Sequence, residues 1–167
     1  MLYDKILLRI DLNKGMVCII TLNKCPENTR CIIVESDLPD AFRSRLMGLG
    51  WLPGREIKVL RKAPFGDPTI YLVDSTEISL REDDSKFIKV EPVYPAPLSV
   101  VSEGKYVVLR FEGGRVFIQK MKSLEIKIGQ EITVLPHEEG CKINVIADGK
   151  NILIGYGMAN KIFVEKK

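Results

Sequence analysis

Residues 49–60 read LGWLPGREIKVL and residues 124–135 read LEIKIGQEITVL, so one pattern occurs twice in this chain. Each copy is followed by an extended apolar segment and then by a matching end, at residues 78–91 and 152–165. Two copies are too few for a solenoid, which generally needs about three or more repeats. The repetition therefore predicts two tandem copies of one small all-β module.

The beginnings of the two copies also match when Gly15 is aligned with Gly104. With this alignment, Gly54 follows Gly15 by 39 positions in the first copy, and Gly129 follows Gly104 by 25 in the second. The first copy is then longer by 14 residues. We expect the extra length between its first strand and its helix, at residues 25–39.

The composition is that of an ordinary soluble globular protein, with 46% hydrophobic and 28% charged residues among 167. The net charge of +3 arises after Pro92, where 11 Lys and Arg residues accompany 8 Asp and Glu residues. Binding to nucleic acid requires a denser basic face, so no nucleic-acid partner is expected. No apolar run approaches the roughly 20 residues that span a bilayer. No signal peptide opens the chain, so we expect a cytoplasmic protein without a transmembrane segment.

Short β-branched runs separated by turn residues predict roughly five strands in the first copy, which suits a small closed barrel. Phe42, Leu46 and Leu49 form one apolar helical stripe, which predicts a short helix over residues 41–47. In the second copy, the Gly113-Gly114 pair favours a tight turn between strands. The second helix is therefore expected to be shortened or lost.

A proline-rich segment separates the two copies, with three prolines at residues 91–97. Such a composition favours an extended, semi-rigid spacer over a flexible one. We therefore predict a first module at residues 1–91, a linker at residues 92–97 and a second module at residues 98–167.

The four cysteines lack the paired spacing of a structural zinc site. Cys18 and Cys31 lie in β-branched runs, where a thiol usually packs as a small buried hydrophobe. Cys25 lies in a polar loop and is expected to be exposed. The chain has one histidine and no serine in a nucleophile elbow, so we expect no enzymatic activity.

Three segments of the first copy closely resemble the FeoA family, ferrous iron transport protein A. They are RLMGLGWLPG at residues 45–54, APFGDP at 63–68 and ISLR at 78–81. The segment ILIGYGMANKI at residues 152–162 is similar to the end of the same family's pattern. The resemblance implies one SH3-like barrel per module. It also implies a cytoplasmic accessory protein, at the inner face of the membrane, that works with the cytoplasmic portion of FeoB. FeoB is a membrane ferrous-iron transporter with a guanine-nucleotide-binding domain.

The loop at residues 64–68, with two prolines and a glycine, is the best candidate for partner binding. Prolines lower the entropy cost of presenting a side chain to a partner. The predicted partner-binding residues are Pro64, Phe65, Gly66, Asp67, Leu49 and Trp51. Two alternatives stay open: Phe65 folds back onto the barrel rim, and Trp51 packs in the core.

Two polar clusters carry side chains of the kind that bind divalent transition metals such as iron or zinc. One cluster consists of His137, Glu138, Glu139 and Cys141, and the other is the acidic run at residues 82–84. They motivate an alternative function, a metal-responsive regulatory or sensor module. A third hypothesis, on fold analogy alone, is an SH3-like module that binds RNA or proline-rich peptides. The oligomeric state stays open.

Overall fold

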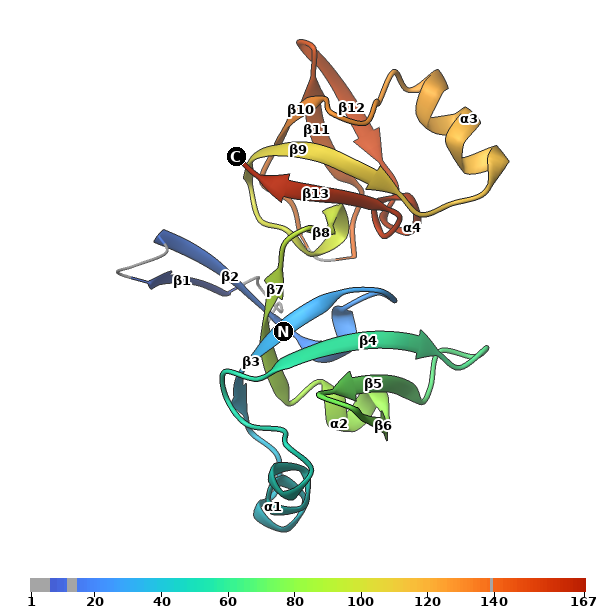
Figure 1. Ribbon diagram of the computed structural model, residues 1–167. Coiled ribbons are helices and arrows are strands. Elements are labelled where there is room, and N and C mark those ends of the chain that lie inside the picture. The colour runs from blue at the N-terminus through green and yellow to red at the C-terminus, as the bar shows by residue number, and fades with distance from the viewer. Residues whose placement is uncertain (1–6, 12–14, 139) are drawn as a thin grey trace. The chain divides into compact units, whose positions relative to one another are not determined.

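The computed structural model describes residues 7–11, 15–138 and 140–167 (Figure 1). These residues divide into two compact units, Leu7–Val93 and Tyr94–Lys167, which we name the first and the second module. Each module is an SH3-like barrel of antiparallel strands around its own apolar core. Among the described residues, no helix is both long enough and apolar enough to cross a bilayer.

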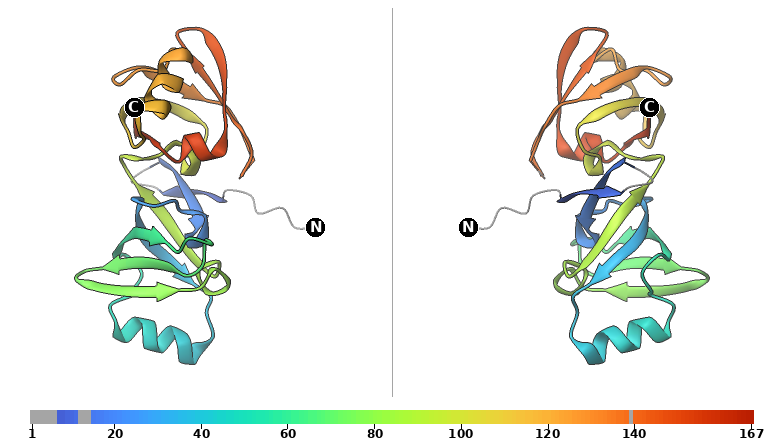
Figure 2. Two further views of the ribbon diagram at one scale, coloured as in Figure 1. Left: turned by 90° about the vertical axis from the view of Figure 1, so that its right-hand side faces the viewer. Right: turned by 90° about the vertical axis from the view of Figure 1, so that its left-hand side faces the viewer.

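The first module has a seven-stranded sheet in the order β1-β2-β7-β3-β4-β5-β6. Its strands are β1 (Leu7–Asp11), β2 (Gly15–Thr21), β3 (Arg30–Ser36), β4 (Glu56–Lys62), β5 (Thr69–Val73), β6 (Thr76–Leu80) and β7 (Ile88–Val93). Its helices are the 3-10 turn η1 (Leu22–Lys24), α1 (Asp40–Gly48) and α2 (Glu82–Ser85). The α1 helix lies at one end of this module, on the segments that leave β3 and enter β4 (Figure 2).

The second module has a six-stranded sheet in the order β12-β11-β10-β9-β13-β8. Its strands are β8 (Ala96–Pro97), β9 (Gly104–Phe111), β10 (Glu131–Val134), β11 (Ile143–Ala147), β12 (Lys150–Ile154) and β13 (Ile162–Lys166). Its helices are the 3-10 turn η2 (Leu98–Val100), α3 (Arg115–Ser123) and α4 (Tyr156–Ala159). The five strands β13-β9-β10-β11-β12 repeat the order β7-β3-β4-β5-β6 of the first module.

The strand pairing shows which parts of the two modules are equivalent. The β3 strand pairs with β4 and β7, and β9 pairs with β10 and β13 in the same way. The β9 strand, which begins at Gly104, is therefore equivalent to β3, whereas Gly15 begins β2. The predicted alignment of Gly15 with Gly104 is wrong, because similar composition does not identify a strand's pairing partners.

The extra length of the first module lies before η1. The η1 and η2 turns are equivalent, since each follows a strand that pairs with the closing strand of its module. The segment from Leu22 to Gly54 is only one residue longer than the equivalent segment from Leu98 to Gly129. The additional structure is β1 and the longer β2 with which it pairs, because β2 has seven residues and the equivalent β8 has two. The prediction that it lies at residues 25–39 is therefore wrong.

The segment predicted as a linker, residues 92–97, is divided between the modules at the Val93–Tyr94 bond. Pro92 and Val93 end β7, and Ala96–Pro97 forms β8, which pairs with β13. Four of these six residues therefore belong to strands.

The second module keeps its helix, so the prediction that this helix is shortened or lost is wrong. The α3 helix has nine residues, as α1 does. The glycine pair starts the helix: the Ile118 N–H donates to the Gly114 carbonyl oxygen at 3.1 Å. A Cβ atom at Gly113 would lie 2.5 Å from the Phe117 ring, so a glycine is required there. Met121 is the buried residue that holds α3 against the core.

The α1 helix ends in a Schellman motif. The Trp51 N–H donates to the Leu46 carbonyl oxygen at 3.1 Å, and the Gly50 N–H donates to the Met47 carbonyl oxygen at 3.0 Å. Gly50 has a φ of +92°, in the left-handed region that this motif requires. Trp51 and Leu46 are both buried, as expected for the apolar pair that usually accompanies the motif.

The α3 helix ends in the same motif with a side chain in place of the glycine. The Ile126 N–H donates to the Met121 carbonyl oxygen, and the Glu125 N–H donates to the Lys122 carbonyl oxygen, both at 3.0 Å. Glu125 has a φ of +58° and forms an ion pair with Lys150 across the module. The repeated backbone geometry explains why the repeat is strongest immediately after each helix.

Replacing Gly50 by alanine tests this motif. We expect Gly50→Ala to lower the free energy of unfolding by about 1–2 kcal/mol, because a Cβ atom disfavours the left-handed conformation. Urea denaturation measures the change. The matched control is Glu125→Ala at the equivalent position, where both the old and the new residue have a Cβ atom. It removes only the exposed ion pair with Lys150, so it should destabilise the chain clearly less than Gly50→Ala does. Equal midpoints for Gly50→Ala and the parent chain would contradict the prediction.

Candidate functional site

The loop that joins β4 to β5 runs from Ala63 to Pro68 and carries Phe65 near its tip, so we name it the Phe65 loop. The Gly66 N–H donates to the Ala63 carbonyl oxygen at 2.7 Å, which closes a β-turn. Pro64 occupies the turn position whose φ proline already fixes. At the base, the Ala63 N–H donates to the Pro68 carbonyl oxygen at 3.0 Å. The loop backbone is therefore closed by its own hydrogen bonds.

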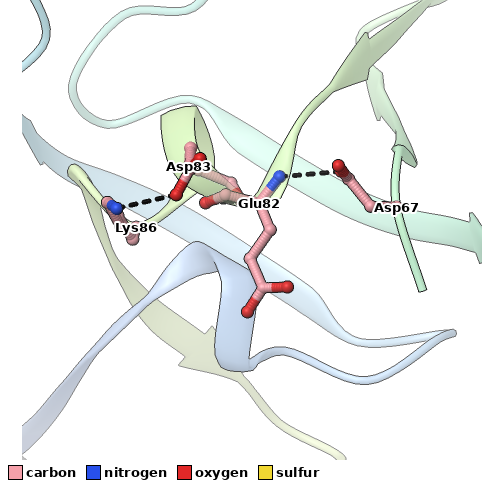
Figure 3. A network of polar contacts seen from close by, with 5 residues as sticks. Asp67, Glu82, Asp83 and Lys86 are labelled. Atoms are coloured by element: carbon pink, nitrogen blue, oxygen red, sulfur yellow. Dashed lines mark hydrogen bonds and ion pairs between the residues drawn. The ribbon is translucent and has the colours of Figure 1, made fainter.

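Asp67 anchors the Phe65 loop to α2. Its Oδ1 accepts a hydrogen bond from the Glu82 N–H at 2.9 Å, and Glu82 is the first residue of that helix (Figure 3). The first N–H groups of a helix lack partners within the helix, so a carboxylate from another segment satisfies one of them. The bond joins positions 15 residues apart in the sequence and restrains the C-terminal side of the loop.

Lys62 restrains the other side of the Phe65 loop. Its backbone N–H donates to Glu27 Oε1 at 2.8 Å, and its Nζ donates to the Asn23 carbonyl oxygen at 3.2 Å. In addition, the Asn28 N–H donates to the Val59 carbonyl oxygen at 2.8 Å. The segment between β2 and β3, residues 22–29, therefore holds the end of β4 from which the loop departs.

Phe65 is 100% exposed, so the alternative in which it folds back onto the barrel rim is wrong. Burial of a phenylalanine side chain away from water stabilises by about 1.5–3 kcal/mol, and this side chain obtains none of that within the module. Because the loop that carries it is closed and anchored, little further ordering is needed when a partner covers the ring.

Leu49 and Trp51 do not join Phe65 in one surface. Trp51 is 5% exposed and packs edge-on against Tyr71, with ring centroids 5.8 Å apart, so its prediction as a partner-binding residue is wrong and the alternative, a core residue, is confirmed. Leu49 is 43% exposed. The adjacent Gly50 lies near Asp74, in the turn that follows β5. The Phe65 loop precedes β5, whereas Leu49 and Gly50 lie near the turn that follows it. The length of β5 therefore separates Leu49 from Phe65.

The first predicted metal cluster lies in the loop between β10 and β11. His137 Nδ1 lies 3.1 Å from the Leu135 carbonyl oxygen, which only accepts hydrogen bonds, so this nitrogen carries the proton. Glu138 and Cys141 are exposed, and Glu139 lies outside the described residues. Within the described part of the chain, no three His, Cys, Asp or Glu side chains are grouped to hold a metal ion. Metal binding here stays a prediction.

The acidic cluster begins α2, as the sequence predicts for a single helical turn. The Asp83 carboxylate accepts a hydrogen bond from Lys86 Nζ at 2.8 Å, and this bond lowers the pKa of Asp83. The Glu82 carboxylate extends away from that of Asp83 (Figure 3). The two carboxylates thus point in different directions, as expected for acidic side chains that face solvent at the start of a helix.

The prediction of an exposed Cys25 is wrong, because Cys25 and Cys31 are both completely buried. Their Sγ atoms lie 3.4 Å apart. The segment before Cys25 turns inward through η1, and the Cys25 N–H donates to the Leu22 carbonyl oxygen. The polar residues that follow Cys25 suggested exposure, whereas the apolar Leu22 before it is what the fold buries.

Two SH3-like barrels, one with an exposed aromatic side chain on an anchored loop, define a tandem small-barrel protein. The chain belongs to the FeoA family, because the model of the FeoA domain matches residues 20–92 and again residues 96–166. The solution structure of iron(II) transport protein A from Clostridium thermocellum has the same architecture. It is 31% identical, with a TM-score of 0.66, over 89% of this chain and 88% of that chain.

Two further relatives match one module each. The Fe(2+) transport protein A/Fe(2+) transporter FeoB fusion protein of Porphyromonas gingivalis is 31% identical over 70 residues. That match covers 42% of this chain and 8% of the fusion protein, so this chain spans a small part of that relative. FeoA of Stenotrophomonas maltophilia, solved in complex with zinc, is 32% identical over 42% of this chain and 88% of its own, with a TM-score of 0.39.

Proposed function

We propose that this chain is a non-enzymatic, cytoplasmic accessory protein of ferrous iron transport. In this proposal, it binds the cytoplasmic portion of a FeoB-type transporter through the Phe65 loop and modulates that transporter. The observation that carries the proposal is the completely exposed Phe65 on a loop held from both sides. The fusion of a related module with a FeoB transporter in one polypeptide supports the choice of partner.

The physical argument is that of a preorganised binding loop. A phenyl ring exposed to water contributes apolar area when a partner buries it. A mobile loop loses part of that gain through ordering, whereas the turn at Pro64 and the anchors at Asp67 and Lys62 are already made. Aromatic side chains in pockets commonly dominate the energy of such interfaces.

Calorimetric titration of the purified chain with the cytoplasmic domain of the ferrous-iron transporter from the same organism tests the proposal. We expect saturable binding, and a difference between nucleotide-free and guanine-nucleotide-bound transporter domain would identify the state that is recognised. The control is the same titration with the isolated guanine-nucleotide-binding domain of an unrelated protein. Absence of binding at high micromolar concentration would contradict the proposal.

The metal-responsive alternative stays a prediction with its own measurement. Calorimetry with ferrous iron and with zinc, under reducing conditions, measures whether the chain binds either ion at micromolar concentration. If binding is found, a His137→Ala variant is expected to weaken it. An unchanged affinity in that variant would place the metal elsewhere.

A further inference from the structure

The two buried thiols of the first module form a pair for which the proposed function has no role. Cys31 lies on β3, and Cys25 follows η1. Neither side chain is exposed to water, and the two Sγ atoms are 3.4 Å apart. A disulfide between them would close a short loop that contains Pro26 and ends at β3.

The equivalent positions in the second module show that the barrel does not require thiols there. Val101 follows η2 as Cys25 follows η1. Tyr106 is paired with Ile132 on β10 as Cys31 is paired with Ile57 on β4. A valine and a tyrosine therefore fill the positions that two adjacent thiols occupy in the first module, so the barrel fold does not require thiols at these positions.

We propose that Cys25 and Cys31 are an oxidisable dithiol that hydrogen peroxide converts into a disulfide. In the first step, one thiol sulfur is oxidised to a sulfenic acid and peroxide is reduced, with release of one water molecule. In the second step, the other sulfur attacks the sulfenic sulfur and the S–S bond forms, with release of a second water molecule. The two thiol protons end in the water molecules, and the two electrons end on the peroxide oxygen atoms.

Burial sets the rate of this reaction. The hydrogen bond with Cys25 and burial together raise the pKa of the Cys31 thiol well above its ordinary value. The thiolate is the reactive form, so the pair reacts only when the segment at residues 22–29 opens transiently. Once formed, the buried disulfide is protected from reductants in the same way.

Disulfide formation would act on the Phe65 loop through the segment that contains Cys25. Asn23 and Glu27, on either side of Cys25, hold Lys62 at the base of that loop. A cross-link from Cys25 to β3 removes conformations in which this segment is open. Oxidation is therefore expected to fix the base of the Phe65 loop, and a consequence for partner binding rests on the function proposed above.

The first test uses the full chain with Cys141→Ser, which removes the exposed thiol. The folded protein is treated with hydrogen peroxide, the peroxide is removed with catalase, and the protein is then denatured, alkylated and mapped by mass spectrometry. We expect a linked species that joins Cys25 to Cys31 and has lost two hydrogen atoms. It should persist in a Cys18→Ser variant and disappear in Cys25→Ser. A pair that keeps both thiols, or a link that includes Cys18, would overturn the proposal.

The second test measures the coupling to the Phe65 loop by amide hydrogen exchange. In the oxidised chain, we expect exchange of the Lys62 amide to slow by at least roughly fivefold, with Val145 of the second module as an unaffected reference. Unchanged exchange at Lys62 would rule out the coupling. Both tests are made without a transporter domain, so their failure leaves the proposed function standing. Conversely, failure of transporter binding leaves the disulfide testable.

Discussion

The Phe65→Ala variant is expected to bind the transporter domain at least about tenfold more weakly than the parent chain. A tenfold change corresponds to about 1.4 kcal/mol. This is close to the smallest free energy expected from burying a phenylalanine side chain. The free energy of unfolding should not change, because Phe65 is completely exposed and contributes no burial to its module. Calorimetric titration measures the affinity, and urea denaturation of the same preparations measures the stability.

Two further variants separate the aromatic side chain from its support. Val116→Ala removes another exposed apolar side chain, 80% exposed on α3 of the second module, and should leave the affinity unchanged. Asp67→Ala keeps Phe65 but removes the bond to the Glu82 N–H, so we expect a smaller loss of roughly two- to fivefold from the cost of ordering the loop. Equal affinities for Phe65→Ala and the parent chain would show that the partner binds elsewhere.

The fold was predictable where one short segment determines the structure. The pattern at residues 49–60 and 124–135 combines a helix end, a turn glycine and an alternating strand, and each of these depends on neighbouring residues. The same reasoning failed for Gly15 and Gly104, because the assignment of a strand depends on partners far away in the sequence. It also failed for α3, because the Gly113-Gly114 pair begins a helix that is held by the burial of Met121 in the core, which neighbouring residues do not reveal.

The tight turn of the Phe65 loop was predictable from the sequence, whereas the hydrogen bonds that anchor this loop to other segments were not. Two prolines and a glycine predict a tight turn at Phe65 from local chemistry. The anchors were not visible in the sequence, because Glu27 reaches Lys62 across 35 residues and Asp67 reaches Glu82 across 15. The thiol pair was missed for a similar reason: the polar neighbours of Cys25 predict exposure, while its partner lies on a separate strand.

Each module buries one tyrosine completely in its core, and the two tyrosines come from strands that are not equivalent. In the first module, Cys31 on β3 lies diagonally across β4 from Tyr71 on β5, as the pairings with Ile57 and Val59 show. Burial raises the pKa of Tyr71 to about 12, and its side chain is completely buried. A small residue on the first strand is thus combined with a large one on the third.

The second module reverses this arrangement. Tyr106 on β9 is paired with Ile132, and Val145 on β11 is paired with Val134, so the tyrosine comes from the first strand and the small residue from the third. Tyr106 is completely buried, and its hydroxyl donates to the Ser102 carbonyl oxygen at 2.9 Å. Each module therefore combines one tyrosine with one smaller residue across its middle strand, and the two modules differ in the strand that supplies the tyrosine.

Tyr106→Cys, which gives the second module the first module's residue, is expected to lower the free energy of unfolding by about 3 kcal/mol. The change removes a buried aromatic ring and leaves a cavity. Adding Val145→Tyr, which supplies the ring from the other strand, should recover at least about 1 kcal/mol of that loss. Urea denaturation under reducing conditions measures both variants.

The single variant Tyr106→Phe separates volume from hydrogen bonding, because it keeps the ring and loses the bond to Ser102; we expect a loss of about 1 kcal/mol. If the double variant is no more stable than Tyr106→Cys alone, a tyrosine at position 145 does not fill the cavity left at position 106. Each module then has its own way of filling its core. If the double variant recovers stability, the two modules follow one packing rule, in which either the first or the third strand can supply the tyrosine.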